Sequence, residues 1–256
     1  MDRIFVFVIG AIIGSFLNVC IHRIPKGGSI VSPASHCPHC KKSIPWYDNI
    51  PVFSYLVLAG KCRHCKGKIS FRYPLVELVT AGLILLLYIS LGVSAKFFIY
   101  SALTSALIAV TFIDLDVSEI PDGISVGGLA AGIVLAFMFP SLFGLSLRWP
   151  SFLSSILGAF AGGLSIYAMG LFGRLAFKKE AMGGGDVKLM AMIGSVLGWK
   201  LVLLAFFVAP VLGAISGVIA KLKGRDTIPY GPYLSAAAVV VMFFGNRILD
   251  LLFYGM

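Results

Sequence analysis

Charged side chains are scarce in this sequence. Asp, Glu, Lys and Arg make up 12% of the 256 residues, whereas about 25% is typical of soluble domains. Hydrophobic residues make up 59% of the chain, and the mean hydropathy is +0.96. This composition excludes an ordinary soluble domain and indicates an α-helical protein that crosses a membrane several times.

Acidic residues are the rarer kind of charge, with 11 Asp and Glu against 21 Lys and Arg. Sixteen of the 21 basic residues fall in three alternate polar segments, 21–73, 174–188 and 221–232, and five lie in the other segments. Cytoplasmic loops of membrane proteins are enriched in Lys and Arg in this way. The asymmetry predicts that the three segments are cytoplasmic, that both termini are external, and that nucleic acid is not a partner.

Long apolar runs, which membrane-spanning helices require, predict an all-α polytopic fold with about eight transmembrane helices. The run at 186–199 has only about 14 residues, so a re-entrant element is the alternative there. The first run lacks a small-residue cleavage site, and we expect it to be retained as a helix. The runs lie near 4–20, 74–92, 97–114, 122–140, 152–174, 186–199, 201–220 and 233–253. The expected domains are a first transmembrane helix, a cytoplasmic loop and a membrane-embedded domain, at 1–20, 21–73 and 74–256.

Cysteine is also rare, and four of the five cysteines lie in the predicted cytoplasmic loop. They form two C-x-x-C pairs, Cys37 with Cys40 and Cys62 with Cys65, with 21 residues between the pairs. Two such pairs are typical of a structural zinc site with four thiolate ligands. Two disulfides are the alternative, but they are rare in the reducing cytoplasm. Neighbouring histidines offer substitute or supporting ligands, at His36, His39 and His64.

The few acidic residues are not spread evenly. Four of them cluster where a predicted helix reaches the cytoplasmic side, and these are Asp114, Asp116, Glu119 and Asp122. A fifth, Asp186, follows three glycines at the start of another apolar run. A carboxylate in hydrocarbon costs several kcal/mol unless it is paired, hydrated or protonated. These positions therefore call for a functional explanation.

Asp114 and Asp186 are predicted to lie at the same face of the membrane. Two carboxylates close together in an apolar pocket share one proton, so one can act as the acid and the other as the base on a water molecule. This is the chemistry of aspartic proteases. Two alternatives stay open at this point: a helix cap at Asp186, and a cation transporter that uses the carboxylates as ion ligands and the cysteine loop as a metal sensor.

Longer motifs favour the protease. Gly183, Gly184, Gly185 and Asp186 match the pattern G-x-G-D, and the pattern I-D-L-D-x-x-x-x-P-D begins at Ile113. The two C-x-x-C pairs accompany GSFLNVCIHRIP from 14 to 25, PLVE from 74 to 77 and IPYGPYL from 228 to 234. With these motifs the chain resembles, over nearly its whole length, the type IV prepilin peptidases, which are intramembrane aspartic proteases of the GxGD class.

The resemblance implies that Asp114 and Asp186 are the catalytic pair, and that Gly183 and Gly185 allow a close approach of the backbone to substrate or to a neighbouring helix. It implies a multi-pass enzyme of the bacterial inner membrane with its active site facing the cytoplasm. The expected substrates are prepilins and pseudopilins, which are cleaved after a glycine between a short basic leader and a hydrophobic helix.

The remaining carboxylates receive supporting roles from the same resemblance. Asp116, Glu119 and Asp122 are expected to line the entrance and to attract the basic leader. Type IV prepilin peptidases also methylate the new N-terminal amine with S-adenosylmethionine, and the loop at 21–73 is expected to belong to that activity. Glu77 is a candidate contact to the substrate amine or the methyl donor. Its alternative is an ion pair with Arg72 or Arg23.

Overall fold

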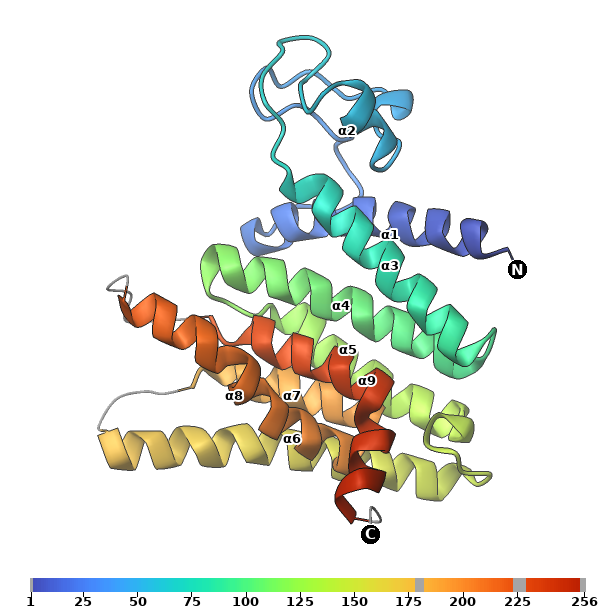
Figure 1. The fold of residues 1–256 in the computed structure, drawn as a ribbon, viewed down its shortest axis with the longest axis vertical. Coiled ribbons are helices and arrows are strands. Elements are labelled where there is room, and N and C mark those ends of the chain that lie inside the picture. The colour runs from blue at the N-terminus through green and yellow to red at the C-terminus, as the bar shows by residue number, and fades with distance from the viewer. Residues whose placement is uncertain (1, 178–181, 223–228, 254–256) are drawn as a thin grey trace. The chain divides into compact units, whose positions relative to one another are not determined.

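The computed structural model describes residues 2–177, 182–222 and 229–253, which form helices and turns with only two isolated β-bridges. The chain divides into two compact units, Met1–Gly92 and Val93–Met256. Figure 1 shows the helices of each unit, coloured along the chain from the N-terminus to the C-terminus. The predicted all-α class is confirmed.

The first unit contains two long helices, α1 (Arg3–Arg23) and α3 (Arg72–Leu91), and the polar loop between them. The two helices cross in close contact (Figure 1). Gly14 of α1 makes this contact possible, because a Cβ atom there would lie 2.6 Å from the Cα atom of Glu77 in α3. The loop contains three short helices, which are η1 (Ile24–Lys26), η2 (Trp46–Asp48) and α2 (Phe53–Val57).

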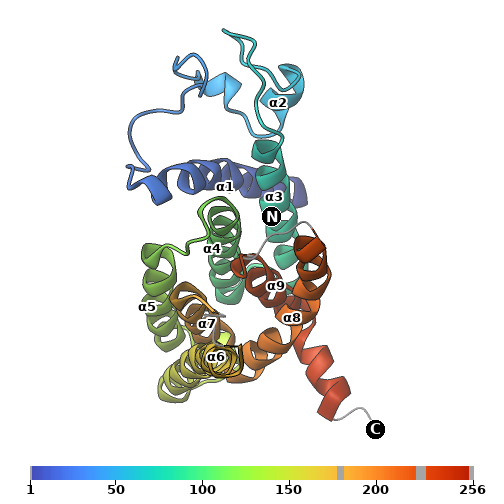
Figure 2. The same ribbon diagram turned by 90° about the vertical axis from the view of Figure 1, so that its left-hand side faces the viewer.

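The second unit packs its other helices around α7, which is Gly184–Leu197. Helix α7 contacts each of the other five long helices described in this unit, and Figure 2 shows it among them. Its core-facing side chains Leu189, Met190 and Ile193 are fully buried. The surrounding elements are α4 (Ala95–Val117), α5 (Asp122–Met138), η3 (Pro140–Phe143), α6 (Arg148–Phe177), α8 (Trp199–Leu222) and α9 (Gly231–Phe253).

The contact between α6 and α7 depends on glycine. A Cβ atom on Gly158 would collide with the carbonyl oxygen of Gly194, and a Cβ atom on Gly194 would collide with that of Gly158. Beside them, the Ser155 hydroxyl donates a hydrogen bond of 2.7 Å to the carbonyl oxygen of Ser195. Small residues and hydroxyl groups of this kind are typical of helix contacts inside membranes. They fix α7, and with it the start of the helix that carries Asp186.

The long helices coincide in position with the eight predicted apolar runs, but the count of eight spans is not confirmed. Within the described residues, five helices are long and apolar enough to cross a membrane: α1, α3, α4, α6 and α9. Helix α5 and the Trp199–Ala214 part of α8 are apolar but shorter. Helix α7 has 14 residues, which is below the roughly 17 residues that a spanning helix needs.

Candidate active site and cysteine cluster

Asp114 lies near the end of α4, and its side chain is buried. Its Oδ2 atom accepts a hydrogen bond of 2.9 Å from the backbone N–H of Gly231, the first residue of α9. The first N–H groups of a helix have no partner within the helix, so this carboxylate satisfies one of them. A Cβ atom on residue 231 would lie 2.7 Å from the same oxygen. A glycine at this position therefore allows α9 to begin directly against the carboxylate.

Asp186 is buried at the start of α7. Its Oδ2 atom accepts a hydrogen bond of 3.2 Å from the backbone N–H of Gly183, the residue that precedes the helix. The helix-cap alternative considered for Asp186 is thus realised in part. Gly185 lies between them, and a Cβ atom there would be 3.0 Å from the Cβ atom of Ile120. The glycines bring the turn close to the segment that follows Asp114.

The two aspartates lie in the same region of the second unit. Helices α4 and α7 are in contact, and the carboxylates are near enough for their charges to interact. Tyr230 lies beside them, just before α9. Burial raises the pKa of its phenol to about 12, and the negative charge of Asp186 contributes to this rise. The site thus combines two buried carboxylates with a neutral hydroxyl group.

The three acidic residues expected at the entrance are exposed. Asp116 is in the last turn of α4, Glu119 is in the turn after it, and Asp122 is the first residue of α5. Asp122 is paired, because Lys188 of α7 donates to its two oxygens at 2.7 and 2.8 Å. Lys188 therefore neutralises part of the negative charge that the sequence places at this entrance.

The four loop cysteines converge in the first unit, and all four Sγ atoms lie within 4.8 Å of one another. The two C-x-x-C segments form equivalent turns. The backbone N–H of Lys41 donates to the carbonyl oxygen of Cys37 at 2.9 Å, and the backbone N–H of Lys66 donates to the carbonyl oxygen of Cys62 at 3.0 Å. Both lysines have positive φ values, 59° and 57°. The cysteines are free thiols, so the disulfide alternative is not realised.

The sulfur positions match a tetrahedral metal site. Zn–S bonds of about 2.3 Å require sulfur atoms about 3.8 Å apart in a tetrahedron, and Cys37 Sγ and Cys65 Sγ are 3.8 Å apart. Backbone N–H groups of Cys65 and His64 lower the pKa of the Cys62 thiol to about 6. Burial and contacts with the other three sulfur atoms raise the pKa of the Cys65 thiol to about 11. Thiolate is the form that binds metal, so a bound cation would be needed for all four cysteines to ionise together. The histidines lie outside the four-sulfur cluster.

Glu77 is buried in α3, one and a half turns from its start. Its Oε2 atom accepts a hydrogen bond of 2.8 Å from the backbone N–H of Val52, and the Ser15 side chain also bonds to the carboxylate. The contact to Val52 links the membrane helix to the polar loop. Arg23, one of its predicted partners, donates to the carbonyl oxygens of Ser29 and Pro33 at 2.9 and 2.7 Å.

Two family models match the chain: the bacterial peptidase A24 N-terminal domain over residues 8–91, and the type IV leader peptidase family over residues 101–218. The prepilin leader peptidase/N-methyltransferase of Bacillus subtilis (strain 168) is 36% identical over 250 residues, which are 95% of each chain. The chain belongs to the type IV leader peptidase family. The resemblance inferred from the sequence motifs is therefore confirmed.

Further type IV leader peptidase relatives agree with this assignment. The prepilin leader peptidase/N-methyltransferase of Myxococcus xanthus (strain DK1622) is 40% identical over 216 residues, which are 84% of this chain and 62% of that protein. The chain thus spans less than two thirds of that relative. A type 4 prepilin-like proteins leader peptide-processing enzyme of Escherichia coli O78:H11 is 36% identical over 252 residues, which are 91% of each chain. No solved structure matches the chain at a significant level.

Two groups of this site could not be given a role from the sequence motifs. Tyr230 and the Gly231 N–H lie at the carboxylates, although they are 44 and 45 residues after Asp186. Their segment, IPYGPYL, was noted only as a motif, and its first residue lies outside the described residues. The available signal was a tyrosine directly before a helix and a glycine as the first residue of that helix. A second missed contact is that of Val52 with Glu77.

Proposed function

We propose that this type IV leader peptidase cleaves prepilins and pseudopilins with Asp114 and Asp186 as its catalytic pair. The observation that carries the assignment is a pair of buried carboxylates on two helices that are in contact, each with one oxygen bound to a backbone N–H. Neither the family match nor the relatives support the cation transporter considered earlier.

The pair supports hydrolysis of a peptide bond by a bound water molecule. The ionised carboxylate removes a proton from water as its oxygen attacks the carbonyl carbon, and the protonated carboxylate donates its proton to the carbonyl oxygen. Collapse of the resulting gem-diol breaks the C–N bond and transfers a proton to the leaving amine. The N–H groups of Gly231 and Gly183 hold one oxygen of each carboxylate and leave the other for water and substrate.

The cysteine cluster fits a structural zinc ion with Cys37, Cys40, Cys62 and Cys65 as ligands. Zinc in such a site stabilises the fold of a small domain and supplies no reaction step. The names of the relatives extend the function to N-methylation, with S-adenosylmethionine as the expected methyl donor. The pocket of about 460 Å³ between α6 and α8 does not fit that donor, because its lining is almost wholly apolar. We therefore assign no residue to methyl transfer.

We also propose that the protein lies in the inner membrane of a bacterium with the catalytic pair facing the cytoplasm and both termini outside. The support is the distribution of Lys and Arg along the chain. The prepilin leader is basic and cytoplasmic in type IV pilus systems, so this orientation brings it to the exposed acidic residues Asp116 and Glu119.

The test is leader cleavage of a prepilin in membranes that contain the full-length protein, followed by mass measurement of the product's N-terminus. Asp114→Asn and Asp186→Asn should each abolish cleavage, because asparagine cannot accept and return the proton. The double variant should be no worse than either single one, since the two residues act as a unit. Asp116→Asn is the control on the same helix and should keep its kcat, because Asp116 is exposed and is proposed to attract the leader and not to act on the scissile bond. Substantial cleavage by a folded Asp186→Asn protein would exclude the pair.

A further inference from the structure

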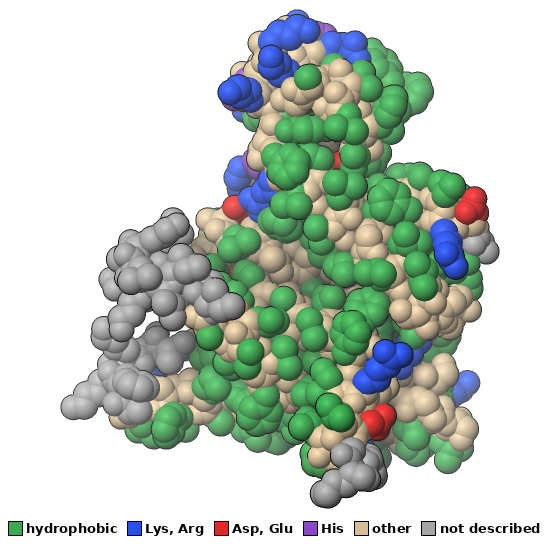
Figure 3. All heavy atoms as spheres, viewed as in Figure 1, with side chains coloured by type: hydrophobic (Ala, Val, Ile, Leu, Met, Phe, Trp, Pro, Cys, Tyr) green, Lys and Arg blue, Asp and Glu red, His purple; other side chains and the backbone are tan. Residues whose placement is uncertain are grey.

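The segment from η2 to α2, Trp46–Val57, carries large apolar side chains that the loop does not cover. The exposed fractions are 80% for Trp46, 60% for Phe53, 70% for Leu56 and 61% for Val57. In Figure 3, hydrophobic side chains gather on the side of the loop where α2 lies, and Lys and Arg gather on another side. Packing on the cysteine turns therefore does not explain these side chains.

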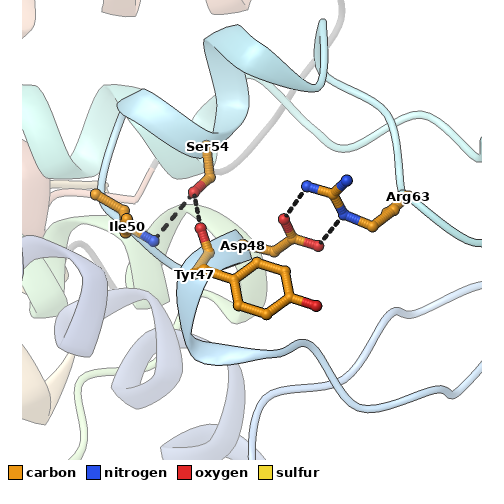
Figure 4. A network of polar contacts seen from close by, with 5 residues as sticks. All are labelled: Tyr47, Asp48, Ile50, Ser54 and Arg63. Carbon is orange, nitrogen blue, oxygen red and sulfur yellow. Dashed lines mark hydrogen bonds and ion pairs between the residues drawn. The ribbon is translucent and has the colours of Figure 1, made fainter.

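Hydrogen bonds hold this segment in a defined shape. The Ser54 hydroxyl donates to the carbonyl oxygen of Tyr47 at 3.0 Å, and the backbone N–H of Ile50 donates to the same hydroxyl at 3.1 Å (Figure 4). The guanidinium of Arg63 donates to both oxygens of Asp48 at 2.7 and 2.6 Å (Figure 4). The apolar side chains are thus presented by an ordered element.

The hydrogen bond to Glu77 sets the level along α3 at which the segment Trp46–Val57 lies. Glu77 lies five residues after the start of α3 at Arg72, or about 7.5 Å along the axis at 1.5 Å per residue. The headgroup layer on each side of a bilayer is about 5–8 Å thick. With Arg72 flanking the span, as expected of a basic residue, the hydrogen bond from Val52 to Glu77 lies within about one headgroup-layer thickness of the end of the span.

The apolar surface of the segment continues onto α3 within the same unit. The ring of Tyr55 in α2 packs edge-on against Phe71 just before α3, with 6.4 Å between the ring centroids. Phe71, Tyr73 and Leu75 are themselves exposed at the beginning of the span. The lipid-facing surface of α3 and the apolar side chains of Trp46–Val57 thus belong to one patch.

We propose that the segment Trp46–Val57 lies in the headgroup layer of the bilayer, on the side where α3 begins, with the side chains of Trp46, Phe53, Leu56 and Val57 in contact with lipid. Tryptophan and other amphipathic aromatics are enriched at this depth, and short apolar faces bury themselves there. Because Val52 has a positive φ of 62°, which is rare for a β-branched residue, its bond to Glu77 holds a strained start of α2. The contact with lipid keeps the cysteine loop at the membrane surface.

The test uses full-length protein, with one copy in each lipid nanodisc, and fluorescence of a single tryptophan. The chain has three tryptophans, so Trp149→Phe and Trp199→Phe leave only Trp46. Nitroxide groups near the headgroups should remove most of its emission, nitroxides at the acyl-chain ends should remove little, and acrylamide in the water should have a weak effect. The control protein has Trp46→Phe and Lys42→Trp, which moves the reporter to an exposed position in the first cysteine turn. It should respond mainly to acrylamide.

Three results would overturn the proposal. Emission from Trp46 that responds to acrylamide as strongly as the Lys42→Trp control would show a segment in water. Blue-shifted emission that neither lipid nitroxides nor acrylamide quench would show a protein partner. Equal lipid quenching at both positions would show that the whole loop lies on the membrane without a fixed segment. In the Glu77→Leu variant, which has no acceptor for the Val52 N–H, lipid quenching of Trp46 should fall. Unchanged quenching in a folded Glu77→Leu protein would overturn the role of Glu77 in holding the segment at its depth.

Discussion

The contact between Gly231 and Asp114 predicts that Gly231→Ala impairs cleavage although alanine is only one methyl group larger. The new Cβ atom would lie 2.7 Å from Oδ2 of Asp114, whereas ordinary van der Waals contact begins near 3.4 Å. Relief of this overlap requires a displacement of about 0.7 Å. Added to the present N–H···O distance of 2.9 Å, that displacement exceeds the range of a hydrogen bond.

The expected loss can be worked out from that bond. A hydrogen bond to a charged group contributes about 1.5–3 kcal/mol, and each 1.4 kcal/mol corresponds to a factor of about ten in rate. Gly231→Ala should therefore lower kcat about 10- to 100-fold. The KM for the prepilin should change little, because the carboxylate acts on the scissile bond and not on the leader. The pH profile should also change shape, since the profile of a dyad reports the pKa values of the pair.

The assay is the initial rate of leader cleavage in proteoliposomes over a range of prepilin concentrations and pH. Gly245→Ala is the matched control in the same helix, because its Cβ atom would be equally crowded, by Cδ2 of Leu201 at 2.7 Å and Cγ1 of Val241 at 2.8 Å, but by no carboxylate. This control should keep near-normal kcat. A Gly231→Ala enzyme with kcat within twofold of the unmodified protein would refute the positioning role. A fall in thermal stability without a change in pH profile would show a merely structural effect.

Three other predictions follow from the two units. Purified protein should contain about one zinc ion per chain by elemental analysis, and the Cys62→Ser variant should lose the ion and become sensitive to protease in the loop. A loop that is compact without metal would contradict the proposed zinc site. Cysteine-accessibility labelling should find Ser29 and Gly224 cytoplasmic and Gly144 external; Gly224 lies outside the described residues. An external Ser29 would reverse the proposed topology. Lys188→Met should lower the KM for a basic leader, because it leaves the negative charge of Asp122 unpaired. It should change the free energy of unfolding by less than about 1 kcal/mol, because the ion pair is exposed. An unchanged KM would argue against acidic residues that attract the leader.

The membrane helices could be predicted from the sequence because their signal is local. Each apolar run lies within a few residues of an observed helix, and the two C-x-x-C pairs gave the cysteine cluster through their spacing alone. The number of spans does not follow from the sequence in the same way, because it depends on exact helix length, and α5, α7 and the apolar part of α8 are close to the minimum for spanning.

Contacts between distant segments could not be predicted in this way. The bond from Gly231 to Asp114 joins residues 117 apart, and that from Val52 to Glu77 joins a loop to a helix. Lys188 illustrates the same limit. Its ammonium group pairs with Asp122, 66 residues earlier, and neither residue lies in a motif that predicts the other as its partner. Hydropathy and motif spacing contain no information about which helix ends meet.

The three glycines around the proposed catalytic pair differ in how much room they leave, and this difference predicts a graded response to alanine. At Gly231 the new methyl group would collide with the Asp114 carboxylate, at Gly185 it would press on Ile120 at 3.0 Å, and at Gly183 it would sit 3.4 Å from Oδ2 of Asp186, an ordinary contact. Gly183 also has an extended backbone, with φ of −78° and ψ of 150°, which alanine adopts freely.

Because the N–H of residue 183 survives the change, Gly183→Ala should retain most activity, Gly185→Ala should lose part of it, and Gly231→Ala should lose the most. The measurement is kcat for leader cleavage of the three variants side by side. If Gly183→Ala were as damaged as Gly231→Ala, the G-x-G-D glycines would be required by the substrate and not by the packing around the two carboxylates.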